Sequence, residues 1–202
     1  MDFSSLPDEN TLLATLEALN ARNITTEVVD NRSEALKTLK AYLPDTAEVM
    51  TGSSMTLDQI GFTDLLKSGN HPWVNLKDGI LTEKDPQKQA DLRRAATLSQ
   101  YFLGSVHAIT RDGQVLVCSG SGSQIPSYSF SSPHVIWVAG AQKIVPDLGV
   151  GLRRIEEYCF PHEDKRMKAL GAAGASLSQI WIVRKSAAGR IKLIFVKEVL
   201  GI

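Results

Sequence analysis

The chain has 202 residues, of which 43% are apolar and 22% charged, and this composition fits one globular domain with a sizeable core. Lysines and arginines equal aspartates and glutamates at 22 each, so the net charge is zero. No basic run with interleaved aromatics occurs, and we expect no nucleic-acid partner. The apolar runs are too short for a bilayer and the first residues lack a signal-peptide pattern, so we expect a cytoplasmic protein without membrane contact.

The first half of the chain alternates between helical and strand patterns. Asn31 with Glu34 predicts a helix cap, Pro44 a stop, and Asp85-Pro86 the start of a long helix. In chain order we expect a helix at 12–19, a strand at 24–29, a helix at 31–43, a strand around 49, a helix from 56, a strand at 73–76 and a helix from 86 to 104. Repeated βα units predict a mostly parallel sheet between layers of helices.

The pattern changes after residue 104. Strand patterns at 105–110 and 115–118 flank Asp112-Gly113, which predicts a hairpin. A buried-type strand at 135–140 is followed by a helix that opens at Pro146 and ends before Pro161. Residues 162–176 fit either a mobile connection or a short helix. Strand patterns at 180–183 and 191–196 predict a terminal hairpin, and no linker divides the chain, so we expect a single three-layer α/β domain over residues 1–202.

A turn of glycine and serine follows the strand around Val49. Thr56 and Gln59 have the spacing of a capping box, in which each side chain satisfies an N–H group of the first helical turn. A junction of this kind directs backbone N–H groups and the positive end of a helix dipole at one point. We therefore predict an anion site formed by Gly52, Ser53, Ser54 and Thr56. The alternative is an ordinary βα turn, since the segment is neither a P-loop nor a dinucleotide fingerprint.

A second glycine and serine turn follows the strand that carries Cys118. If both turns lie at the carboxyl edge of a parallel sheet, they form opposite walls of one pocket. The residues concerned in this second wall are Gly120, Gly122, Ser123 and Gln124. Lys143 lies just past the strand at 135–140 and could supply a positive charge, or it is an ordinary solvated lysine.

No spacing of histidines or cysteines predicts a metal site, and we expect no cofactor. His107 fits a histidine packed on a sheet face. Cys118 and Cys159 are expected to be reduced and unpaired, with a nucleophilic role for Cys118 as the less favoured reading. Ser53 or Ser54 could join a triad, but no nucleophile elbow is present.

Several segments resemble the lactate-utilisation (LUD) domain family, lactate utilisation protein C-like, once a domain of unknown function. The matching stretches lie in consistent order at 52–61, 93–96, 104–113, 138–145 and 189–202. The resemblance implies an α/β fold like the ribose-5-phosphate isomerase and CoA-transferase group, in which the first glycine and serine turn cradles a phosphate or nearby anion. Family members usually read Gly-Asn-Arg where this chain has Gly122-Ser123-Gln124. Many carry a cysteine-rich insert, which is lacking at 168–178, so no iron–sulfur cluster is expected there.

The favoured hypothesis is a role in organic-acid (lactate-type) utilisation, with a small anionic metabolite, carboxylate or phosphate, bound at the glycine and serine turns. The resemblance implies iron–sulfur redox proteins of the same pathway as partners, and a homo-oligomer is left open. One alternative is an enzyme acting on a sugar phosphate or acyl-CoA, with Asp58 or another carboxylate as base. Another is a regulatory module that binds a metabolite without turnover. Catalytic residues are not assigned.

Overall fold

The computed structural model describes residues 2–202. Its α-helices are α1 (Glu9–Ala21), α2 (Arg32–Ala41), α3 (Met55–Gln59), α4 (Phe62–Ser68), α5 (Leu76–Thr82), α6 (Pro86–Ala95), α7 (Leu148–Arg154) and α8 (Phe160–Ala169). Its strands are β1 (Ile24–Val29), β2 (Glu48–Thr51), β3 (Val74–Asn75), β4 (Tyr101–Gly104), β5 (Ala108–Thr110), β6 (Val115–Ser119), β7 (His134–Gly140), β8 (Ile144–Val145), β9 (Gln179–Val183) and β10 (Ile191–Val196).

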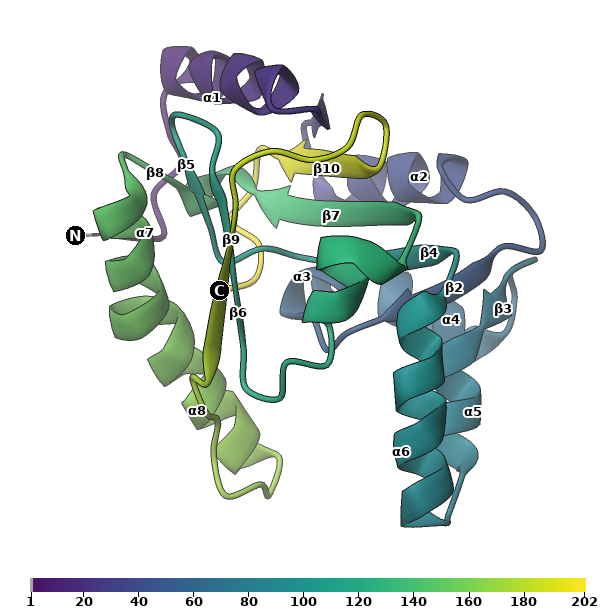
Figure 1. The fold of residues 1–202 in the computed structure, drawn as a ribbon. Helices are drawn as coiled ribbons and strands as arrows, with labels where there is room; N and C mark the ends of the chain where they lie inside the picture. Colours follow the sequence, from purple (N-terminus) through teal and green to yellow (C-terminus); the bar gives the residue numbers. More distant parts are fainter. Residues whose placement is uncertain (1) are drawn as a thin grey trace.

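Six strands form one parallel sheet in the order β1-β10-β7-β4-β2-β3 (Figure 1). Local sequence signals set its connections: Asn31 accepts a hydrogen bond from the N–H of Glu34, whose carboxylate accepts one from the N–H of Asp30. The parallel α/β fold expected from the alternating pattern is confirmed. Because all six strands run the same way, their carboxyl ends share one edge, where ligands of open α/β sheets bind.

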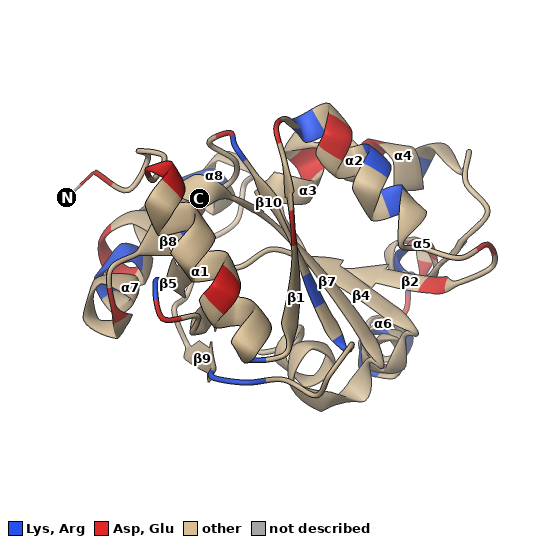
Figure 2. Ribbon diagram, turned by 90° about the horizontal axis from the view of Figure 1, so that it is seen from above, with Lys and Arg blue, Asp and Glu red and all other residues tan. Residues whose placement is uncertain are grey.

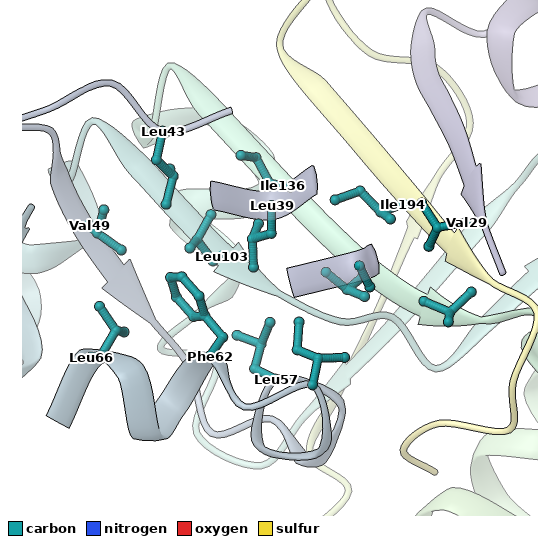
Figure 3. Close-up of a cluster of buried hydrophobic side chains, with 14 of the residues drawn as sticks. Val29, Leu39, Leu43, Val49, Leu57, Phe62, Leu66, Leu103, Ile136 and Ile194 are labelled. Atoms are coloured by element: carbon teal, nitrogen blue, oxygen red, sulfur yellow. The ribbon is translucent and has the colours of Figure 1, made fainter. Parts of the chain in front are cut away.

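One face of this sheet is covered by α2, α3 and α4. Figure 3 shows Leu39, Leu57 and Phe62 from these helices pointing at Leu103 and Ile136 of the central strands. All five side chains are buried, and none carries a polar atom. This cluster fixes α3 against the sheet, and with it the turn that precedes α3.

The other face is covered by α1 and by a second sheet of four strands in the order β8-β5-β6-β9. The hairpin expected around Asp112-Gly113 is confirmed as β5 and β6, which pair antiparallel. The outer face of the second sheet packs against α7 and the π-helical turn that follows it, through Leu116, Val150 and Ile155. In Figure 1 the second sheet lies between the larger sheet and α7.

The long helix expected from Asp85 to Gly104 is wrong in its second half. α6 ends at Ala95, a short 3-10 turn follows, and Tyr101–Gly104 forms β4 between β2 and β7. Leu92, Phe102 and Leu103 have helical spacing, which led to the expectation of a continuous helix. Burial of Tyr101–Gly104 between two strands favours a strand there instead. The strand expected at 73–76 is also shorter, because Asn75 caps α5, a helix that was not expected from the sequence pattern.

The two C-terminal strands form where they were expected and are joined by a short connection, but they do not pair with each other. β9 pairs antiparallel with β6, whereas β10 lies between β1 and β7 in the larger sheet. The expected hydrogen bonding of a terminal hairpin is therefore corrected. The reason is long-range packing. The apolar strand β10 is buried in the parallel sheet, where β1 and β7 provide its hydrogen-bonding partners on both sides.

The helix that was expected to end before Pro161 continues past it. A π-helical turn at Ile155–Cys159 joins α7 to α8, and Pro161 lies in the first turn of α8. Proline lacks an N–H group and its ring crowds the preceding turn, and the wider π turn accommodates both effects. Residues 162–169 are thus helical, and α8 reaches over the carboxyl edge of the sheet.

Charges of both signs are interspersed along the helices (Figure 2), in keeping with the zero net charge. Within residues 2–202, each helix is too short or too polar to cross a membrane.

Candidate functional site

A pocket of about 530 Å³ lies at the carboxyl edge of the larger sheet. Its floor is built by residues that follow parallel strands: the turn after β2, Ser105 after β4 and Lys143 after β7. Counting the turn after β2 as the first wall, the turn after β6 forms the second wall, and α8 with the loop at 174–177 forms the third. Elements distant in the sequence therefore meet at one cavity.

The first turn leads from β2 into α3 through Gly52, Ser53 and Ser54. The hydroxyl of Ser54, not that of Thr56, caps the helix and accepts the N–H of Leu57 at 3.3 Å. The expected Thr56–Gln59 capping box is therefore wrong. α3 has only five residues, so its dipole contributes little to an anion site here.

The second turn lies directly against the first. Gln124 donates through Nε2 to the carbonyl of Cys118 at 3.2 Å, and its Oε1 atom lies against Gly52. A Cβ atom at position 52 would lie 2.8 Å from that oxygen, so a larger residue there would require the end of the Gln124 side chain to shift. β6 belongs to the second sheet, however, so this turn does not extend the edge of the parallel sheet as expected.

The structure brings almost all of the sequence-predicted site residues to one pocket. Those that line it are Gly52, Ser53, Ser54, Thr56, Gly120, Ser123, Gln124 and Lys143. Gly122 is not among the lining residues; it takes a left-handed conformation within the turn, and its N–H is bound by Ser119 Oγ at 2.9 Å. Asp58, considered as a base, is exposed outside the pocket and accepts the hydroxyl of Thr63.

Lys143 is the central charge of the pocket. It is only 2% exposed, and Nζ donates to the carbonyl of Val106 at 2.9 Å, to Ser105 Oγ at 3.1 Å and to Thr56 Oγ1 at 3.4 Å. All three acceptors are neutral, and no carboxylate of residues 2–202 lies within 4.0 Å of Nζ. Burial, followed by the positive charge of Arg154, lowers the pKa of Lys143 to about 7. The reading of Lys143 as a solvated lysine is therefore wrong.

Gly201 lies close to both Lys143 and Thr56. Its backbone is left-handed at φ 65°, and its N–H donates to Gln59 Oε1 at 2.6 Å. A Cβ atom at this position would lie 3.0 Å from Lys143 Nζ and would collide with Thr56 Oγ1. Glycine thus allows the chain to close over the ammonium group.

His107 is a second polar group on the pocket wall. Its Nδ1 atom accepts the N–H of Cys118 at 3.1 Å, so the neutral ring carries its proton on Nε2. Burial, with the charges of Lys143 and Arg154, lowers the pKa of His107 to about 3. The ring therefore remains neutral at physiological pH and is a hydrogen-bond donor rather than a cation.

Both cysteines are free and both line the pocket. Burial raises the pKa of Cys118 to about 12, and burial also raises that of Cys159 although Arg154 donates to its sulfur at 2.9 Å. Both are therefore protonated thiols near neutral pH, which disfavours the nucleophilic reading of Cys118.

A model of the LUD domain matches residues 13–196 of this chain. The chain belongs to the LUD domain family. A solved structure of similar fold is that of a DUF162 family protein from Deinococcus radiodurans, with a TM-score of 0.59, 10% identity, and coverage of 95% of this chain and 99% of that chain. No match was found among curated proteins.

The third wall of the LUD domain pocket was not predicted from the sequence. It is formed by α8, where Arg166 binds Glu163 through two hydrogen bonds of 2.7 and 2.6 Å and reaches Ser53 Oγ at 3.3 Å. The spacing of Glu163 and Arg166 would suit an ion pair on any exposed helix. Only the continuation of the helix past Pro161 places this pair over the pocket.

The same LUD domain holds no cluster of three His, Cys, Asp or Glu side chains suited to a metal within residues 2–202. The segment 168–178, which contains no cysteine, forms the end of α8 and the loop that borders the pocket.

Proposed function

We propose that this LUD domain binds a small organic carboxylate in the pocket at the carboxyl ends of β2, β4 and β7, as part of organic-acid (lactate-type) utilisation. The observation that carries the proposal is Lys143: a buried ammonium group with three neutral acceptors and no acidic partner within residues 2–202. The family resemblance supports the class of metabolite.

The physical argument starts from the cost of burying a charge. Transfer of an unpaired ammonium group from water costs several kcal/mol, and neutral oxygen acceptors recover only part of it. A carboxylate that enters the pocket would supply the missing countercharge in a site of low dielectric, where the attraction is strong. The volume of about 530 Å³ lies within the range of small-molecule sites.

The remaining groups suit a hydroxylated or carbonyl-bearing acid. His107 offers a neutral N–H donor, while Ser53 and Ser123 offer hydroxyl groups. Such uncharged partners can bind a hydroxyl or carbonyl oxygen beside the carboxylate.

A single negative charge is favoured over a phosphate ester. Lys143 is one buried cation, and the guanidinium of Arg166 is already held by Glu163. Gln124 stands where family members usually carry an arginine, so that wall offers no second positive charge. A doubly charged group would therefore be incompletely compensated in the pocket.

The test is a thermal-shift and calorimetry panel of lactate, other small carboxylates, ribose phosphates and CoA esters. A ligand present at a hundred times its dissociation constant stabilises the fold by about 2.7 kcal/mol. We expect stabilisation by small monocarboxylates in the wild type and its loss in Lys143→Met. Lys88→Met, on exposed α6, is the matched control and should bind as the wild type does.

Two results would replace the proposal. Tight binding of a phosphate ester, not improved by Gln124→Arg, would favour the sugar-phosphate enzyme. If the Lys143→Met variant still binds carboxylates, the binding site does not depend on this lysine and the proposal is wrong. Partnership with iron–sulfur redox proteins is part of the proposal on the family resemblance alone, and co-purification with such proteins from cells would test it.

A further inference from the structure

We propose that Lys143 is a nucleophile that forms a Schiff base with the carbonyl carbon of a 2-oxo acid in this pocket. This inference rests on the proposed function, since the carboxylate must first bind beside the lysine. It adds a reaction and narrows the ligand to acids with a carbonyl next to the carboxylate.

The hydrogen bonds around Nζ have a defined direction. The hydroxyl of Ser105 donates to the carbonyl of Val138 at 2.7 Å, and the hydroxyl of Thr56 donates to Ser105 Oγ at 3.1 Å. Both oxygen atoms therefore accept from Nζ, as does the carbonyl of Val106. The three hydrogens of the ammonium form have one acceptor each. The neutral amine has only two hydrogens, so it leaves one acceptor free and gains a lone pair.

The surroundings favour that neutral form. Burial and the nearby charge of Arg154 on α7 lower the pKa of Lys143 to about 7, and the two other titratable groups that affect it are the thiols of Cys118 and Cys159. Both thiols stay protonated at neutral pH because burial raises their pKa. His107 stays neutral, because its pKa is lowered. Among these groups Lys143 alone exchanges its proton near neutral pH, and its amine is the available nucleophile.

The reaction is balanced without a redox partner. The amine lone pair forms a C–N bond to C2 of the 2-oxo acid, and the carbonyl electron pair moves to oxygen, which takes a proton from the nitrogen. The resulting carbinolamine loses this oxygen as water together with the second N–H hydrogen, and the C=N bond remains. The hydroxyls of Thr56 and Ser105 touch Nζ and can pass these protons, and the Nε2–H group of His107 is suited to bind the carbonyl oxygen.

The experiment uses pyruvate as the probe, with sodium borohydride to reduce the Schiff base to a stable amine. We expect one adduct per chain by intact mass and its location on Lys143 by peptide mapping. Lactate carries a hydroxyl in place of the 2-oxo group, so it should form no adduct. Lys143→Met should lose the adduct and Lys88→Met should keep it. At pyruvate concentrations far below saturation, where the rate reports the ligand-free lysine, trapping should become faster as the pH passes about 7, and not near 10.5 as for an ordinary lysine.

The outcomes separate this inference from the proposed function. If pyruvate and lactate both stabilise the fold but borohydride traps nothing on Lys143, the Schiff base is overturned and carboxylate binding stands. If neither acid binds, the proposed function fails as well. An adduct that persists in Lys143→Met, or spreads evenly over surface lysines, also overturns the inference.

Discussion

Replacing Lys143 with methionine should remove a specific pH dependence from the free energy of unfolding. The pKa of Lys143 is about 7 in the folded protein, against 10.5 for an ordinary lysine in the unfolded chain. Between these values the unfolded chain binds one proton more, so wild-type stability rises with pH by about 1.4 kcal/mol per unit. Below about pH 7 the lysine is charged in both states, and its burial costs the wild type at most about 5 kcal/mol.

Methionine fills a similar volume without a charge, so Lys143→Met should be more stable than the wild type at pH 6. This stability advantage of the variant should shrink by about 2.5 kcal/mol between about pH 7.5 and 9.5. Urea unfolding followed by tryptophan fluorescence at several pH values measures the difference, and Lys88→Met controls for the loss of an exposed lysine. A stability difference that stays constant over this range would refute the reasoning, because an unperturbed lysine would then occupy position 143.

Three further outcomes follow from the structure. Gly201→Ala should destabilise the protein by at least about 1–2 kcal/mol in urea unfolding, because φ is 65° there and the new methyl group meets Lys143. Phe62→Ala should cost about 3–5 kcal/mol, whereas Leu13→Ala, at a position 51% exposed, should stay within about 0.5 kcal/mol. Thiol titration of the unfolded, non-reduced protein should count two free sulfhydryls; in the native protein both should react slowly near neutral pH, and a disulfide would contradict the structure.

Much of the fold could be predicted from local sequence signals. The turn at Asp112-Gly113 predicted the β5–β6 hairpin, and Asn31 with Glu34 predicted the start of α2. The two glycine and serine turns were predicted to share one pocket, and residues of both line it, but the second turn follows β6 of the second sheet and not a strand of the parallel sheet.

The remainder depended on contacts between distant segments. Tyr101–Gly104 has helical spacing with the residues before it, yet it lies between β2 and β7. The burial of Lys143 results from the approach of Thr56, Ser105 and Gly201, three segments far apart in sequence. No pattern around position 143 indicates that approach, so the lysine could not be distinguished from a solvated one.

The central claim, that Lys143 is the countercharge for a bound carboxylate, is tested most directly by proton uptake during binding. Calorimetric titration with lactate, which cannot form a Schiff base, in buffers of different ionisation enthalpy measures the number of protons exchanged. A bound anion should raise the pKa of Lys143, so we predict uptake of nearly one proton per ligand at about pH 8 and almost none at about pH 5.5, where the lysine is already charged. Binding at pH 8 without proton uptake would contradict this account.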